Sequence, residues 1–425
     1  MYLHINNPKA RDKILEVMKG GVFMIHFGNC TLTCADLPGI KELLYNKQGG
    51  ELIFDEKDIE LFADNILIVE GGKLQIGTED KPFQHKAIIT GTAHLHTKEL
   101  PIYGTNSIGV REGILDLHGQ PIPIVWTRLA QTAAAGSNKI VLQQEVYWKI
   151  GNQIVIASTS HRHSQTENEV HTIAFIDGDK KTLTLVKNLT YNHLGVSETI
   201  SGKTLEYRAE VGLLTRNIVL HGERDPQWTE DIQQCPDGFD TDEFAVQTCF
   251  QGRFGEEMGS DQFGIHVIVH PAEPNNGLAI SRVSYVEFTY AGQAFRLGRH
   301  PFYFHLGGNM SSSYIRGCAF HETFNRAINI HGTHNTLIEN NVIYNVMGGA
   351  VFLENGVETG NTIQYNLAVF VRESTSLLND DITPACFWVT NPDNTIQHNS
   401  AAGGSHFGFW YRLIATKCRK CMSTK

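Results

Sequence analysis

Gly49-Gly50-Glu51-Leu52-Ile53-Phe54 is followed 22 residues later by Gly71-Gly72-Lys73-Leu74-Gln75-Ile76. Both stretches open with a glycine pair and carry apolar residues at alternate positions, as a strand with one buried face does. A repeat of about 20 to 50 residues is typical of stacked supersecondary units, because a single unit cannot bury its apolar face without neighbours. The pair therefore predicts a coil of short strands.

A second repeat lies near the C-terminus. Four isoleucines are spaced 23, 25 and 33 residues apart, each followed three residues later by a small or amide side chain: Ile315, Ile338, Ile363 and Ile396. Equivalent residues of a parallel β-helix stack about 4.8 Å apart, so Asn341, Asn366 and Asn399 are expected to form an amide ladder. The sequence thus predicts an all-β fold, a right-handed parallel β-helix (solenoid) that forms a single elongated unit. The longest interval contains an insertion, Ser374 to Pro384, which is expected to leave the coil as a loop.

Bulk composition excludes some classes of function. The chain has 425 residues and a formal net charge of -10, which argues against a nucleic-acid partner because such binding depends on a basic face. The 20 histidines make this charge sensitive to pH, except where they are buried. No run of 18 apolar residues predicts a membrane span, and the N-terminal segment shows no signal-peptide pattern.

Cysteine spacing and glycosylation sequons bear on the compartment. Cys235 and Cys249 flank an acidic loop and are expected to close it as a disulfide in an oxidising compartment. Cys418 and Cys421 form a lone CxxC, which lacks the further ligands of a zinc site. Sequons that favour secretion, although they also arise by chance, begin at Asn29, Asn188 and Asn309.

Several motifs, in order along the chain, carry a family resemblance. The glycine-pair rungs continue into Ile76-Gly77-Thr78-Glu79-Asp80-Lys81-Pro82-Phe83, and the later motifs are residues 207–218, 297–306, 387–389 and 399–403. Together they resemble the fibrocystin family, which carries a domain named for its eight glycines and is related to hyaluronan-cleaving cell-surface proteins. The resemblance covers roughly residues 37 to 413. It implies a β-helix glycoprotein that acts outside the cell, at the cell surface or a cilium.

The resemblance also implies a division of the chain. Residues 1–36 are expected to be an atypical N-terminal extension, and residues 37–170 an eight-glycine domain that is incomplete at its start. Residues 171–260 would form a connecting β segment with an acidic loop, followed by β-helix repeats at 261–413 and an unmatched basic tail at 414–425. These ends suggest a truncated or spliced section whose open rungs expose an unpaired edge, so end-to-end self-association is expected. A nonfunctional splice product is a further reading.

Two departures from the family pattern bear on catalysis. Hyaluronan-cleaving members are expected to have a pair of histidines where this chain has His321-Glu322. They are also expected to have a histidine after the Phe-Trp strand, where this chain has Thr390-Asn391. The resemblance therefore favours a non-catalytic recognition or structural module of a fibrocystin-like receptor. The alternative is a glycosidase that depolymerises hyaluronan or a similar glycosaminoglycan.

Candidate site residues cluster after residue 298. Arg299 is suited to bind a carboxylate-bearing sugar, and nearby histidines to exchange protons. Binding is assigned to Arg299, His305 and His321; if the chain is an enzyme, the catalytic candidates are Arg299, His300, His305 and His331. The alternative is that these histidines bond to backbone carbonyls at corners of the coil.

Carboxylates complete the set of candidates. Glycoside hydrolysis normally uses two carboxylates about 5 to 10 Å apart, and Glu354, Glu358 and the Asp380-Asp381 pair are available without a spacing that selects two of them. Asn379, Asp380 and Asp381 are also candidate calcium ligands, against the alternative of a solvated acidic loop. No other cofactor is expected. The expected partner is an extracellular protein or a glycan, with hyaluronan one candidate.

Overall fold

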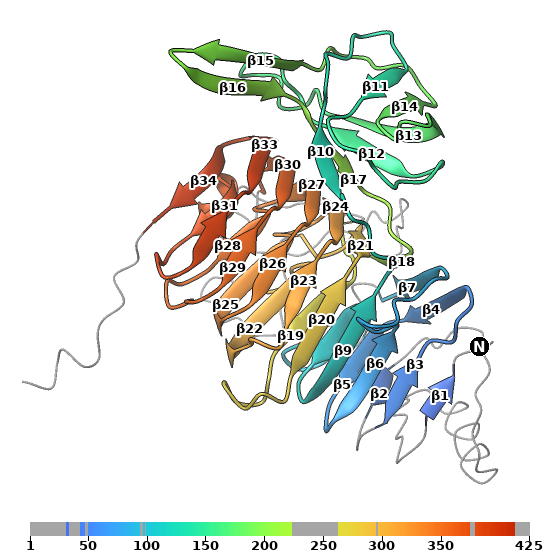
Figure 1. The fold of residues 1–425 in the computed structure, drawn as a ribbon. Coiled ribbons are helices and arrows are strands. Elements are labelled where there is room, and N and C mark those ends of the chain that lie inside the picture. Colours follow the sequence, from blue (N-terminus) through green and yellow to red (C-terminus); the bar gives the residue numbers. More distant parts are fainter. Residues whose placement is uncertain are drawn as a thin grey trace, which may run out of the picture.

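The computed structural model describes residues 31–33, 43–46, 50–93, 97, 99–222, 262–294, 296–374 and 379–412. Parallel strands wind into a β-helix whose turns each contribute one strand to three sheets (Figure 1). The predicted all-β, right-handed parallel β-helix is confirmed. Within the described residues, no helix is both long and apolar enough to cross a bilayer.

Each sheet runs the length of the coil. The first sheet contains β1 (Thr31–Thr33), β3 (Glu51–Ile53), β6 (Gly72–Ile76), β9 (Gly113–His118), β20 (Ile280–Ser284), β23 (Tyr314–Arg316), β26 (Leu337–Glu339), β29 (Thr362–Gln364) and β32 (Thr395–Gln397). The second contains β4 (Ile59–Ala63), β7 (Ala87–Gly91), β18 (Ile218–Gly222), β21 (Val286–Thr289), β24 (Ala319–Thr323), β27 (Val342–Met347), β30 (Leu367–Arg372) and β33 (Ser400–Gly404). The third contains β2 (Leu43–Asn46), β5 (Asn65–Ile68), β8 (Ser107–Val110), β19 (His266–Val269), β22 (Phe302–Asn309), β25 (Ile328–His334), β28 (Val351–Leu353), β31 (Ala385–Val389) and β34 (Phe407–Tyr411).

The register follows the predicted repeats. Leu52 of β3 pairs with Leu74 of β6, as the two glycine-pair stretches require. In the first sheet the four repeated isoleucines pair in sequence, each with the next. Buried apolar side chains fill the lumen of the coil, and the rings of Phe288 and Phe320 stack there with centroids 4.4 Å apart. Stacking of like residues on successive turns is therefore what holds the solenoid together.

The asparagine ladder is confirmed. Asn341 Nδ2 donates to Asn366 Oδ1, and Asn366 Nδ2 donates to Asn399 Oδ1, both at 2.9 Å. The amides of Asn341 and Asn366 also satisfy backbone groups of the preceding turn, as a buried amide must. A second ladder, which we did not predict, joins Asn361 Nδ2 to Asn394 Oδ1 at 3.0 Å.

An inserted unit of antiparallel strands interrupts the coil between β9 and β18 (Figure 1). Its strands are β10 (Trp126–Arg128), β11 (Lys139–Val141), β12 (Gln153–Ile156), β13 (Glu169–Ile176), β14 (Thr182–Leu185) and β17 (Glu210–Leu213), with the hairpin β15 (Gly195–Ile200) and β16 (Lys203–Arg208). The boundary expected between residues 170 and 171 falls inside β13, so the chain does not divide there. The alternating pattern of these strands resembles that of the coil, which is why the sequence did not distinguish them.

The inserted unit packs on the outside of the second sheet. Val155 and Leu214 contact Val342 and Leu367 in one buried apolar cluster. The indole of Trp126 donates to the carbonyl of Tyr365 at 2.7 Å. Apolar contact and this hydrogen bond together hold the unit against the coil.

Candidate functional site

The outer face of the third sheet carries a cluster of hydrogen-bonded aromatic and histidine side chains. Tyr303 and His305 lie two residues apart on β22, so they point to the same face. His305 pairs in register with His331 of β25. The hydroxyl of Tyr303 lies 2.7 Å from His305 Nδ1 and 3.1 Å from His331 Nδ1. We call Tyr303, His305 and His331 the tyrosine–histidine cluster.

A chain of polar contacts extends this cluster toward the C-terminal turns. His331 Nδ1 lies 3.8 Å from Glu354 Oε2, which accepts a hydrogen bond of 2.6 Å from Asn329 Nδ2. Tyr303 and His305 are buried, whereas the side chains of His331 and Glu354 retain 14% and 18% exposure. Solvent, and so a ligand, reaches the cluster at His331 and Glu354.

Arg326 links the cluster to the insertion in the last interval. Its Nη1 donates to Asn329 Oδ1 at 3.2 Å, and its Nε donates to Asp381 Oδ1 at 2.7 Å. The guanidinium also lies 3.6 Å from the centroid of the Phe352 ring. Asp381 belongs to the short helix α2 (Asn379–Ile382) and is buried. This carboxylate is therefore committed to an ion pair.

The ion pair bears on the predicted calcium site. The side chains of Asn379 and Asp380 lie outside the described part of the structure. Among the side chains that are described, no three histidine, cysteine, aspartate or glutamate residues are grouped to hold a metal. Glu358 is also committed, because it is buried and accepts hydrogen bonds from the amides of Gly332 and Gly356.

Arg299 and His300 lie next to the cluster but are packed into loops that cover the face. Arg299 Nη1 donates to the carbonyl of Ile102 at 3.1 Å, and the side chains of Arg299 and His300 are both buried. The ring of His300 packs edge-on against Tyr303, with centroids 5.0 Å apart, and its Nδ1 lies 2.9 Å from Asn325 Oδ1. His300 therefore helps to hold the ring of Tyr303 in place.

Two further histidines match the alternative reading of backbone contacts. His266 Nε2 lies 2.8 Å from the carbonyl of Tyr103, and His270 Nδ1 lies 3.1 Å from the carbonyl of His305. Burial, aided by the nearby charge of Arg299, lowers the pKa of His266 to about 3. His266 is therefore neutral and acts as a packing residue.

His321 does not join the cluster, contrary to the sequence prediction. It lies on β24 of the second sheet, and its Nε2 is 3.1 Å from Glu287 Oε1. The reason is the order of the turns, in which each strand of the third sheet follows one of the second. His321 is thus on a different wall of the coil from His305 and His331.

The predicted modification sites are divided between described and undescribed residues. Asn188 and Asn309 are exposed. The Oδ1 of Asn309 accepts hydrogen bonds from the amide of Ser311 at 3.2 Å and from Asn335 Nδ2 at 3.0 Å. Asn29 and the cysteine pair Cys235 and Cys249 lie outside the described residues.

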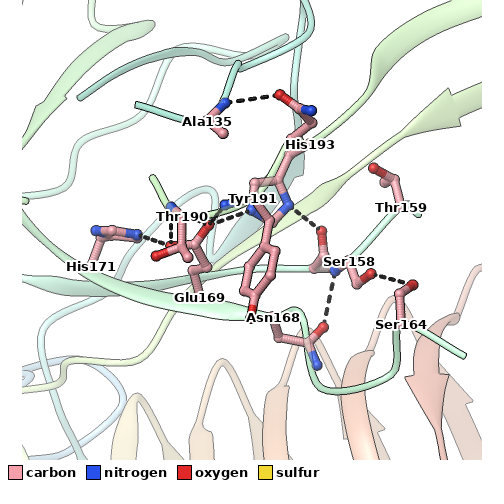
Figure 2. Close-up of polar contacts among 12 residues, drawn as sticks. Ala135, Ser158, Thr159, Ser164, Asn168, Glu169, His171, Thr190, Tyr191 and His193 are labelled. Atoms are coloured by element: carbon pink, nitrogen blue, oxygen red, sulfur yellow. Dashed lines mark hydrogen bonds and ion pairs between the residues drawn. The ribbon is translucent and has the colours of Figure 1, made fainter. Parts of the chain in front are cut away.

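A second polar cluster, which sequence reasoning missed, lies in the inserted unit (Figure 2). The carboxylate of Glu169 accepts hydrogen bonds from the amides of Thr190 and Tyr191, each at 2.8 Å. Its oxygens also lie 3.0 Å from His171 Nε2 and 3.1 Å from His193 Nε2. Although burial acts against it, this set of donors lowers the pKa of Glu169 to about 2.

His193 lies between a backbone carbonyl and the carboxylate of Glu169. Its Nδ1 lies 2.8 Å from the carbonyl of Ala157, and its Nε2 faces the Glu169 carboxylate. Both neighbours are acceptors. The fully buried ring therefore joins β13 to the turn before β15. The spacing of Glu169, His171 and His193 matches no motif, so only the folded structure brings them together.

Comparison with known proteins places this geometry in context. The G8 domain family matches residues 29–130, and the CEMIP beta-helix family matches residues 262–424. The latter match runs through the tail that we expected to fall outside the repeats. Fibrocystin-L of Mus musculus is 57% identical over 397 residues, and that of Homo sapiens 58%; each match covers 93% of this chain and 9% of the relative.

More distant relatives are also similar in sequence. Fibrocystin of Canis lupus familiaris is 30% identical over 403 residues, which cover 89% of this chain and 10% of that protein. The chain thus spans about a tenth of the length of these curated relatives. Among solved structures, the tailspike gp61 of Pseudomonas phage phi297 has 10% identity and a TM-score of 0.21, with coverage of 81% of this chain and 57% of that one.

Proposed function

The chain belongs to the fibrocystin family, and we propose that it is a non-catalytic recognition module of a cell-surface protein that binds a glycan at the tyrosine–histidine cluster. The observation that carries the proposal is the number of carboxylates that the described side chains place in contact with this cluster. Glycoside hydrolysis normally needs two carboxyl groups on either side of the scissile bond. Among the described side chains, Glu354 contacts the cluster, while Asp381 is bound to Arg326.

The exposed part of the cluster suits a polyhydroxylated ligand. His331 and Glu354 offer a donor or acceptor nitrogen and a carboxylate oxygen at the surface, and Asn329 and Arg326 fix them from below. Such side chains, held by a buried hydrogen-bond network, are pre-organised for binding, which reduces the entropy lost on association. Hyaluronan is the first ligand to test.

The second candidate function is depolymerisation of hyaluronan. One observation favours it: the Tyr303 hydroxyl lies within hydrogen-bonding distance of both His305 and His331. A hydroxyl between two imidazoles has the chemistry to pass a proton from one ring to the other. Among the described side chains, Glu354 is the carboxylate found in contact with the cluster, and hydrolysis normally needs two.

Incubation with fluorescent hyaluronan of high molecular mass separates the two functions. Folded protein would be mixed with the polymer at about pH 5 and pH 7, with and without calcium, and analysed by size-exclusion chromatography. We expect the polymer to keep its full length and to co-elute with the wild-type protein but not with the His331→Ala variant. His334→Ala is the matched control, because His334 lies on the same strand outside the cluster. Shortening of the polymer that Tyr303→Phe abolishes would establish the enzymatic alternative instead.

A further inference from the structure

A cleft of about 440 Å³ lies where the inserted unit meets the coil. Its lining residues, between Asp58 and Asn217, precede the tyrosine–histidine cluster in the sequence. One wall is the segment that leads into β7 and includes Gln84 and Lys86. The other wall precedes β12 and includes Tyr147 and Lys149, and the floor includes Arg216. We call this space the junction cleft. Its volume is within the usual range for small-molecule sites, about 300 to 1,000 Å³.

The walls of the junction cleft are joined by a continuous set of hydrogen bonds. Lys149 Nζ donates to Gln120 Oε1 at 2.7 Å, and Gln120 Nε2 donates to the carbonyl of Gln84 at 2.6 Å. Asn217 Oδ1 accepts from the amide of Gln120 at 2.8 Å, while its Nδ2 donates to the carbonyls of Phe83 and His85. The two walls are therefore fixed relative to each other, and the cleft is formed before a ligand arrives.

The charge of the junction cleft is opposite to that of the whole chain. Lys86, Lys149 and Arg216 are its cations, and Asp58 is its carboxylate, whereas the chain has a formal net charge of -10. The Oδ1 of Asp58 accepts a hydrogen bond from the backbone amide of Lys86 at 2.8 Å and lies 3.9 Å from His85 Nδ1, which partly offsets its charge. Low-dielectric walls focus such a positive potential and attract anions.

Arg216 strengthens this potential from the floor. Its Nε donates to the carbonyl of Gly317 and its Nη1 to the carbonyls of Leu213 and Thr215, so the hydrogen bonds of its guanidinium go to neutral acceptors. Nη2 has no acceptor in the described part of the chain. Glu287 is the nearby carboxylate, but it accepts from the Arg216 backbone amide and lies against His321. Burial lowers the pKa of Arg216 only to about 10, so the group stays cationic at neutral pH.

The neutral groups of the junction cleft indicate the class of anion. The side-chain amides of Gln84 and Asn152, at the rim, are suited to bond hydroxyl groups. The ring of Tyr147 is 56% exposed and offers a flat apolar surface, which the Lys180 ammonium approaches to 4.3 Å from the centroid. Lysines, amides and an exposed ring together suit a sugar that carries a carboxylate better than a simple anion. We propose that the junction cleft binds a carboxylate-bearing saccharide, independently of the tyrosine–histidine cluster.

Calorimetric titration of the whole chain with a hyaluronan hexasaccharide tests this proposal. The carboxyl-reduced hexasaccharide and hexaglutamate serve as parallel probes. We expect the acidic hexasaccharide to bind, Lys149→Gln to weaken binding by about tenfold, and the reduced sugar not to bind. Lys139→Gln, which removes one exposed charge from the same unit outside the cleft, is the matched control and should bind like the wild type.

The possible outcomes separate this proposal from the one above. Unchanged affinity in Lys149→Gln, or no binding of the acidic hexasaccharide, would overturn the junction cleft as a saccharide site. Hexaglutamate that binds as tightly, and loses affinity in Lys149→Gln, would overturn the saccharide class in favour of an acidic peptide. Binding lost in His331→Ala but kept in Lys149→Gln would support the tyrosine–histidine cluster alone, whereas the reverse result would support the junction cleft alone.

Discussion

Replacing Glu169 with glutamine should destabilise the inserted unit more than any other carboxylate-to-amide substitution in that unit. The carboxylate holds two backbone amides and two histidines, and its pKa is lowered from 4.5 to about 2. This shift corresponds to about 3 kcal/mol of stability. It is an upper bound, because solvent at the exposed residues Thr190 and Tyr191 screens part of the interaction.

The glutamine variant leaves the buried His193 facing a neutral amide in place of the carboxylate. Removal of one partner from a buried pair typically costs about 3 to 5 kcal/mol. We therefore expect Glu169→Gln to lower the free energy of unfolding of the inserted unit by about 3 kcal/mol at neutral pH. Glu198→Gln, on the exposed hairpin strand β15, is the matched control and should change it by less than about 0.5 kcal/mol.

The pH dependence gives a sharper test. The folded pKa of Glu169 lies below that of the unfolded state, so its stabilisation is fully present above about pH 4.5 and is lost as the pH falls toward about 2. The difference between wild type and Glu169→Gln should shrink over this range. Native-state hydrogen exchange of the β12 and β13 amides measures it locally, which matters because long solenoids need not unfold in one step. A difference that is constant between about pH 6 and pH 3, or below about 0.5 kcal/mol throughout, would refute the reasoning.

Three further predictions concern the coil. Asn366→Ala should lower the free energy of unfolding of the C-terminal turns by about 3 kcal/mol, because the buried partner Asn341 and the half-buried partner Asn399 each lose a hydrogen bond. Urea titration with exposed Asn355→Ala as control measures this, and equal midpoints would contradict it. Arg326→Met should cost about 3 to 5 kcal/mol by removing the guanidinium from the buried Asp381 carboxylate, and the double variant with Asp381→Leu should recover most of the loss in thermal melts. No recovery would show that the pair is not the cause. Phe409 is 54% exposed on β34, although it stacks on Phe387 of the core, and should promote self-association. Phe409→Ser should therefore lower the sedimentation coefficient at micromolar concentration, and a wild type that sediments as a monomer would contradict this.

Regular features of the coil were predictable from sequence because each turn repeats the environment of the one before. The isoleucine spacing gave the register of the first sheet, and the asparagine spacing gave the amide ladder. His305 and His331 were both named as candidates, and they lie together because they occupy equivalent positions on consecutive turns. In each case, a local pattern was sufficient because stacking converts sequence spacing directly into contact.

Features that depend on contacts between different parts of the chain were not predictable. His321 was grouped with His305 as a binding candidate although it lies on another sheet, because sequence spacing does not say which of the three sheets a strand joins. Glu169 meets His193 across a turn that has no recognisable motif, and Asp381 meets Arg326 only after the insertion folds back. The junction cleft is formed by two parts of the fold that the sequence did not separate.

The interruption of the coil has a consequence for how the molecule folds. In the first sheet, Ile114 of β9 pairs with Ile280 of β20, which lies 166 residues later, whereas neighbouring strands near the C-terminus are 23 to 33 residues apart. Closure of so long a loop costs about 1.7 kcal/mol more entropy than closure of a 25-residue one. The turns before β9 and after β20 therefore gain their contacts early and separately, and the joint between them forms last. In refolding, the halves of this apparently continuous rod should behave as two cooperative blocks with a slow docking phase.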